Sequence, residues 1–172
     1  SWSHTKHELW HRCKRKYWYQ NIAPYLLDPG NLDVGKISLL KSLTPKYALQ
    51  GRLIHEILED QMNKHNPGSG PDEEGMISHY LKKVQMYEST SKTTIAEFYN
   101  GVPDETFFDQ IRESGVNQIQ TFFSAIWPHI KNNTYIRHET FDQVFVDSTK
   151  VLLKVDYISQ DPDGTLIITD WK

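Results

Sequence analysis

The stretch LLKVDYISQDPDGTLIITDWK, residues 152–172, contains two apolar segments joined by a tight-turn sequence. Pro162 suits the first central position of a type I turn, and Gly164 suits the left-handed residue that closes a three-residue hairpin loop with a bulge. Such a turn fixes the register of the strands on either side, and this register pairs Asp156 with Asp170. The stretch therefore predicts an antiparallel hairpin with two carboxylates at one cross-strand position.

The rest of the chain places this hairpin at the end of an α+β fold. Period-two alternation predicts strands over residues 135–147, 150–159 and 165–172. Apolar residues at helical spacing predict helices near residues 6–20, 47–58, 76–87 and 107–126. Residues 24–45 carry several prolines and glycines and predict a loop. Helices followed by an antiparallel meander are typical of the α+β class.

The composition fits one globular domain. The chain has 172 residues, of which 38% are hydrophobic, and its formal net charge is −3. No apolar run approaches the roughly 18 residues that span a bilayer, and a single cysteine is typical of a reducing compartment. We therefore expect a cytoplasmic protein without membrane contact. Because the chain starts without Met and ends inside a predicted strand, we also expect it to be part of a longer protein.

The polar residues of the hairpin gather on one face. Side chains alternate along a strand, so Asp156, Asp170 and Lys172 share a face of the sheet. Two carboxylates opposite each other destabilise a hairpin unless a positive charge lies between them. A divalent cation together with Lys172 would supply that charge. A solvated outer face, with Lys172 neutralising one carboxylate, is the alternative that the hairpin leaves open.

The helix sequence GRLIHEILED, residues 51–60, adds a candidate ligand. Gly51 and His55 are four residues apart and share a helical face. Glycine inside a helix often marks a close backbone approach. The segment from His55 reads His-Glu-x-x-Glu, so the second histidine of the zinc-protease motif is missing and that class is excluded. His55 is then a metal ligand or a partly buried helix histidine.

Taken in order, these motifs resemble the RecB-like branch of the PD-(D/E)XK nucleases, which includes Cas4-type and AddB-type nuclease domains. The segment CKRKYWY, residues 13–19, also resembles the Cys-x-Arg-x-Tyr-like segment that opens many of these domains. The resemblance implies a restriction-endonuclease-like core, an antiparallel meander of a central sheet flanked by helices, in one domain over residues 1–172. Residues 72–130 would be a helical insert between the first helix motif and the strands. Leu153 departs from the glycine of many relatives.

The resemblance implies a metal-dependent deoxyribonuclease. The implied ligands of Mg²⁺ or Mn²⁺ are His55, Asp156, Asp170 and the backbone carbonyl of Trp171. Lys172 would orient or deprotonate the attacking water, and Glu56 would be a partner of this site or a residue of the helix surface. Some members bind an iron–sulfur cluster, but Cys13, as the single cysteine, cannot hold one within this chain. A catalytically inactive module that binds nucleic acid or scaffolds a helicase–nuclease is the alternative.

The N-terminal segment KHELWHRCKRKYWYQ, residues 6–20, combines cations with aromatic side chains. Thr5 and Glu8 suggest a capping box at its start. Cations that follow phosphates, beside aromatics that stack on bases, are what single-strand binding requires. The candidate DNA-binding residues are Arg12, Lys14, Arg15, Lys16, Trp18 and Tyr19. The expected partners are DNA, single-stranded or with free ends, and a helicase or repair complex; a packed helix with a solvated basic face is the alternative.

Overall fold

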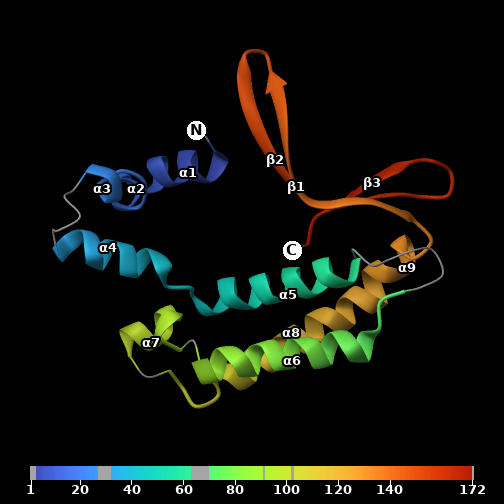
Figure 1. Cartoon of the computed structure of the whole chain (residues 1–172), viewed down its shortest axis with the longest axis horizontal. Helices are drawn as coiled ribbons and strands as arrows, with labels where there is room; N and C mark the ends of the chain where they lie inside the picture. The colour runs from blue at the N-terminus through green and yellow to red at the C-terminus, as the bar shows by residue number, and fades with distance from the viewer. Residues whose placement is uncertain (1–2, 27–31, 63–69, 91, 102, 172) are drawn as a thin grey trace. The chain divides into compact units, whose positions relative to one another are not determined.

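Figure 1 shows a computed structural model of the chain, which describes all residues except 1–2, 27–31, 63–69, 91, 102 and 172. The chain forms two compact units. Unit 1 contains residues 1–44 and 143–152, and unit 2 contains residues 45–142 and 153–172. Helices together with an antiparallel sheet confirm the predicted α+β class and are consistent with a restriction-endonuclease-like fold.

The N-terminal helices of unit 1 differ from the prediction. The predicted helix over residues 6–20 is two helices, α1 (His4–Arg12) and α2 (Lys14–Asn21), which meet at Cys13. Cys13 has an extended backbone, and its sulfur accepts a hydrogen bond from the Lys16 N–H at 3.4 Å, which caps α2. The predicted capping box is also wrong, because the Ser3 hydroxyl accepts from the Lys6 N–H and caps α1. Apolar spacing continues through Cys13, so periodicity alone did not reveal the break.

The predicted loop over residues 24–45 is wrong. This segment contains the end of α3 (Ala23–Leu26) and the whole of α4 (Leu32–Ser42). The Lys41 ammonium donates a hydrogen bond of 2.9 Å to the carbonyl of Gln20, near the C-terminus of α2. A cation stabilises this end of a helix, where backbone carbonyls lack partners. The contact therefore joins α4 to α2.

The helices of unit 2 pack around one apolar core. Helices α5 (Lys46–Met62), α6 (Glu73–Thr90) and α8 (Phe107–Thr121) lie side by side (Figure 1) and contact one another. These three confirm the predicted helices from Tyr47 onward. The short helices η1 (Lys92–Thr94) and α7 (Ala96–Asn100) were not predicted. A π-helical segment, η2 (Phe122–Ile126), joins α8 to α9 (Trp127–Ile130).

Tyr80 of α6 packs against Gly115 of α8. Tyr80 is fully buried, and its hydroxyl donates a hydrogen bond of 2.7 Å to the carbonyl of Ile111. Burial raises the pKa of Tyr80 to about 12, so the hydroxyl keeps its proton at neutral pH. A Cβ added at Gly115 would lie 2.0 Å from Cζ of the Tyr80 ring. Glycine is therefore required at position 115 by packing.

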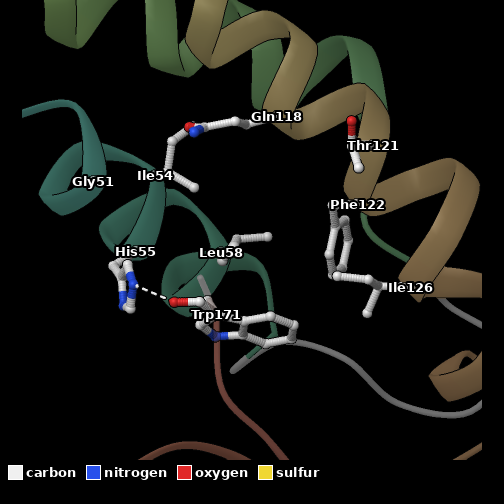
Figure 2. A pocket seen from close by; sticks show the side chains of 9 residues that line it. All are labelled: Gly51, Ile54, His55, Leu58, Gln118, Thr121, Phe122, Ile126 and Trp171. Carbon is white, nitrogen blue, oxygen red and sulfur yellow. Dashed lines mark hydrogen bonds between the residues drawn. The ribbon is translucent and has the colours of Figure 1, made fainter. Parts of the chain in front are cut away.

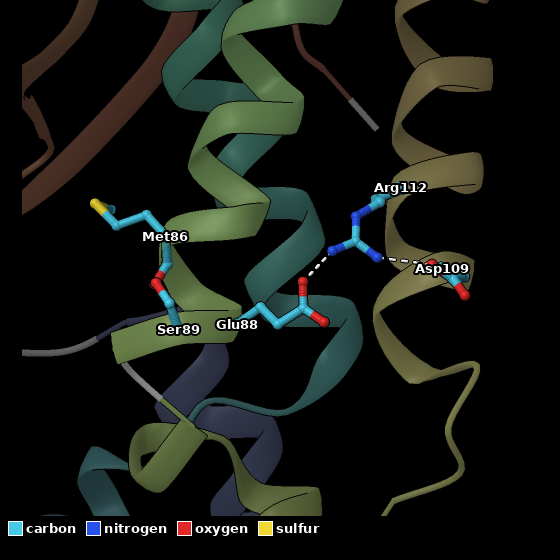
Figure 3. A network of polar contacts seen from close by, with 5 residues as sticks. All are labelled: Met86, Glu88, Ser89, Asp109 and Arg112. Atoms are coloured by element: carbon cyan, nitrogen blue, oxygen red, sulfur yellow. Dashed lines mark hydrogen bonds and ion pairs between the residues drawn. The ribbon is translucent and has the colours of Figure 1, made fainter.

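A polar network connects the same two helices at the surface. Arg112 of α8 pairs with Glu88 of α6 and, at 2.7 Å, with Asp109 one turn earlier in α8 (Figure 3). Exposed ion pairs contribute only about 0–1 kcal/mol each. The network therefore contributes little to stability.

The sheet has the predicted topology. Strands β1 (Thr134–Val146), β2 (Thr149–Gln160) and β3 (Leu166–Thr169) lie in the order β1-β2-β3. Tyr157 pairs with Thr169 in an antiparallel ladder, which confirms the predicted register. Gly164 has φ 95°, and its N–H donates to the carbonyl of Asp161 at 3.0 Å. The turn chemistry of Pro162 and Gly164 was thus predicted correctly.

A buried polar pair anchors β2 to the chain that precedes β1. The Asn133 amide donates a hydrogen bond of 2.9 Å to the Ser159 hydroxyl, and both residues are buried. We expect Ser159→Ala to lower the free energy of unfolding by about 1–3 kcal/mol, because it leaves a buried amide donor without this acceptor. Urea denaturation measures the change. Ser78→Ala, at an exposed position of α6, is the control, and equal losses in the two variants would contradict the expectation.

No helix in the described part of the chain is both long and apolar enough to span a membrane.

Candidate active site

The histidine of α5 lies against the segment that follows β3. Nε2 of His55 is 3.1 Å from the backbone carbonyl oxygen of Trp171, although 116 residues separate them in the sequence (Figure 2). A carbonyl oxygen only accepts hydrogen bonds, so Nε2 is the protonated nitrogen in this contact. Packing between α5 and the end of the hairpin therefore brings two of the predicted ligand positions together.

Asp156 lies close to both residues of this contact, His55 and Trp171. Its carboxylate oxygen Oδ2 accepts a hydrogen bond of 2.8 Å from the Trp171 N–H, and lies 3.9 Å from Nδ1 of His55. Asp156 is only 8% exposed, so it does not belong to a solvated outer face. By accepting a hydrogen bond from the Trp171 N–H, the carboxylate holds the backbone of the residue whose carbonyl faces His55.

The remaining predicted site residues lie differently. Asp170 follows β3 directly and is exposed. Among the residues that the structure describes, no three His, Cys, Asp or Glu side chains are grouped closely enough to hold a metal ion. Asp170 is therefore not gathered with His55 and Asp156. Lys172 lies outside the described residues.

The carboxylate of Glu56 points from α5 toward α6. Its Oε2 forms an ion pair of 2.7 Å with Lys83 of α6, and its Oε1 lies 3.9 Å from Arg52. The contact with Lys83 links the helix that carries His55 to its neighbour. A direct role of Glu56 beside the metal stays a prediction.

His55, Asp156 and the carbonyl of Trp171 are suitable donors for a divalent cation. Two adjacent ligands of an octahedral ion, each about 2.1 Å from the metal, lie about 3.0 Å apart. The separation of His55 Nε2 from the Trp171 oxygen is 3.1 Å. A buried carboxylate also needs a compensating charge, which a cation supplies. The residues present would thus fit such an ion, provided that His55 Nε2 carries no hydrogen in the metal-bound form.

A pocket of about 250 Å³ opens beside this group (Figure 2). Besides His55 and Trp171, its lining includes Gly51 of α5, and Phe122 and Ile126 of the π-helical segment. The expectation of a close backbone approach at Gly51 is wrong, because none of the described atoms lies within 4 Å of a Cβ placed there. This pocket could not be predicted from the sequence, because apolar periodicity does not distinguish a π-helical segment from a continuous α-helix.

The predicted DNA-binding residues lie in unit 1 and divide between two helices. Arg12 ends α1, whereas Lys14, Arg15 and Lys16 begin α2. All six candidates are exposed, including Trp18 and Tyr19. The Arg15 guanidinium lies 5.9 Å from the centre of the Tyr19 ring, a cation–π contact. Exposed cations beside exposed rings suit a nucleic-acid interface, and the assignment stays a prediction.

Comparison with models of known protein families gives a match over the whole chain. The family model described as the PD-(D/E)XK nuclease superfamily matches residues 1–172. Searches of curated proteins and of solved structures find no match.

Proposed function

The chain belongs to the PD-(D/E)XK nuclease superfamily, and on this premise we propose that it is a metal-dependent nuclease of the RecB-like branch that hydrolyses DNA phosphodiester bonds. The observation that supports this proposal most strongly is the contact of His55 with the Trp171 carbonyl, beside the buried Asp156 carboxylate. His55 comes from α5, Asp156 from β2 and Trp171 from the segment after β3, and α5 is far from the other two in the sequence.

In the proposed mechanism, His55, Asp156 and the Trp171 carbonyl would hold Mg²⁺ or Mn²⁺. Asp170, which is not grouped with His55 and Asp156 among the described residues, would become a further ligand when the ion is bound. An imidazole ligand favours Mn²⁺ over Mg²⁺. When bound, such an ion would supply two effects, a lower pKa of a coordinated water and neutralisation of charge on the scissile phosphate. Asp156 has a second task, because its hydrogen bond to the Trp171 N–H holds the neighbouring carbonyl in position.

Lys172 orients the attacking water in this proposal and stabilises the negative charge that develops on the phosphate. Glu56 has an indirect role in this proposal, because its ion pair with Lys83 holds α5, which carries His55, against α6. The exposed cations and rings of α1 and α2 bind the DNA strand, which is single-stranded or has a free end. We further propose exonuclease activity in the cytoplasm, with a helicase or another DNA-repair protein as partner.

Labelled single-stranded and duplex DNA, incubated with the full-length protein, test this proposal. We expect hydrolysis with Mn²⁺ or Mg²⁺ and none with EDTA. Asp170→Ala and Lys172→Ala should each reduce the rate by about 100-fold or more, because each removes metal binding or charge stabilisation in the transition state. Quantitative gel analysis of the products measures the rates.

Lys82→Ala, at an exposed position of α6, is the control for removing a lysine. Undiminished cleavage in both Asp170→Ala and Lys172→Ala would mean that another site, or another protein, cuts the DNA. DNA binding without hydrolysis under any metal condition would instead support the catalytically inactive module.

A further inference from the structure

A second pocket lies in unit 1, where α2 and α4 contact each other. Its volume is about 620 Å³, which is within the range of ligand-binding pockets. We call this pocket the α2–α4 groove. Its lining includes Arg15, Lys16 and Tyr19 of α2 together with Lys36, Leu40 and Lys41 of α4.

The α2–α4 groove is strongly cationic. Arg15 and Lys16 contribute charge from one helix, and Lys36 and Lys41 from the other. No aspartate or glutamate is found among the described residues that line it. Cations gathered without carboxylates repel one another and attract anions, so the groove favours a ligand that carries several negative charges.

The floor of the groove adds apolar and aromatic surface. Ile37 is buried beneath it, whereas the Tyr19 ring is 40% exposed and Leu40 is 45% exposed. A small inorganic anion would leave this surface uncovered. A nucleic-acid strand has both features that the groove complements, because its phosphates are anionic and its bases have flat apolar faces.

We infer that the α2–α4 groove binds a single strand of nucleic acid, with its phosphates on the four cations and a base against Tyr19. This inference rests on the proposed function for its substrate class. It adds Lys36 and Lys41, from a helix that the sequence did not predict, to the DNA-binding residues. The hydrogen bond from Lys41 to the Gln20 carbonyl keeps α4 against α2 and so maintains the groove.

The double variant Lys36→Gln/Lys41→Gln tests this inference in the full-length protein. Glutamine removes the charge and keeps a polar side chain at both positions. Binding of a fluorescein-labelled oligo(dT) strand is measured by anisotropy at several salt concentrations, with EDTA present to prevent hydrolysis. Loss of two phosphate contacts on a single strand should reduce the slope of log affinity against log salt by about 1.4.

Lys82→Gln/Lys131→Gln is the matched control, because it removes the same charge from exposed positions in unit 2. This control should keep the wild-type slope, and thermal melting should show that both double variants are folded. Tyr19→Leu should weaken binding without changing the slope, because it removes stacking but no charge. An unchanged slope in Lys36→Gln/Lys41→Gln overturns the inference, as does equal or tighter binding of a duplex.

The hydrolysis and salt-dependence experiments distinguish a failure of the nuclease proposal from a failure of this inference. If no metal supports hydrolysis but the Lys36→Gln/Lys41→Gln slope flattens, the nuclease proposal fails and the groove remains a nucleic-acid site. If hydrolysis occurs and the slope is unchanged, the groove assignment alone fails.

Discussion

Asp156→Asn is expected to reduce DNA hydrolysis by about 100-fold or more while the protein stays folded. Asparagine retains a carbonyl oxygen that accepts the Trp171 N–H, so the hydrogen bond at the end of the hairpin survives. The variant loses the buried negative charge that a cation would neutralise. Single-turnover hydrolysis with saturating Mn²⁺ measures the loss of rate. A loss of about 100-fold or more is what removal of one electrostatic contribution to transition-state stabilisation costs in enzymes.

A second readout for this variant does not depend on activity. Mn²⁺ that binds the folded state should raise the melting temperature of the wild type, and this rise should be smaller in Asp156→Asn. Glu113→Gln, at an exposed carboxylate of α8, is the control and should behave as the wild type in both assays. A rate of DNA hydrolysis by Asp156→Asn within tenfold of the wild-type rate would show that the catalytic centre lies elsewhere.

Gly115→Ala is expected to lower the free energy of unfolding by about 3 kcal/mol. A methyl group at this position would overlap Cζ and the hydroxyl of Tyr80, at 2.0 and 2.2 Å. Tyr80 is fully buried and bonded to the carbonyl of Ile111, so it has little freedom to move away. Overpacking of this kind costs about 1–3 kcal/mol, and the severity of the overlap indicates the upper end. Urea denaturation measures the effect.

Gly51→Ala is the matched control within α5. The space around a Cβ at position 51 is open among the described residues, so alanine should stabilise the helix by about 0.5–1 kcal/mol. Tyr80→Leu should cost less in the Gly115→Ala background than in the wild type, because the two side chains compete for one volume. Similar stabilities for Gly115→Ala and Gly51→Ala would contradict the packing argument.

The hairpin could be predicted from the sequence because its causes are local. Pro162 and Gly164 determine the turn, and the turn determines the register that pairs Tyr157 with Thr169. The long helices were also predicted, because helices that pack into a core, such as α5 and α8, carry apolar residues at helical spacing. These elements depend on residues that are close together in the sequence.

The helices of unit 1 could not be predicted in the same way. Gly35 lies inside α4 and suggested a loop, but the segment from Leu32 to Ser42 is helical and is joined to α2 through Lys41. The Cys13 sulfur accepts a hydrogen bond from the Lys16 N–H and caps α2, so one apolar pattern is divided between two helices. In both places side-chain contacts determine the structure more than residue spacing does.

The candidate site was predicted in part. The order of the motifs indicated that His55 would meet the hairpin, and the contact with Trp171 has this geometry. The burial of Asp156 and the pocket beside Gly51 depend on packing among α5, the π-helical segment and β2. Such packing leaves no short motif. Asp170 shows the same limit, because strand alternation predicts its face but not its position after β3 ends.

The separation of His55 from Trp171 also affects the order in which the protein folds. The β2–β3 hairpin closes a loop of a few residues, whereas the His55 contact spans 116 residues. Closing that span costs about 4 kcal/mol of chain entropy by the logarithmic loop law. Contacts of this length form after local ones, so folding intermediates can contain the hairpin and helices while the candidate centre is still incomplete. A nascent chain would therefore acquire the ability to cut nucleic acid only as its folding finishes.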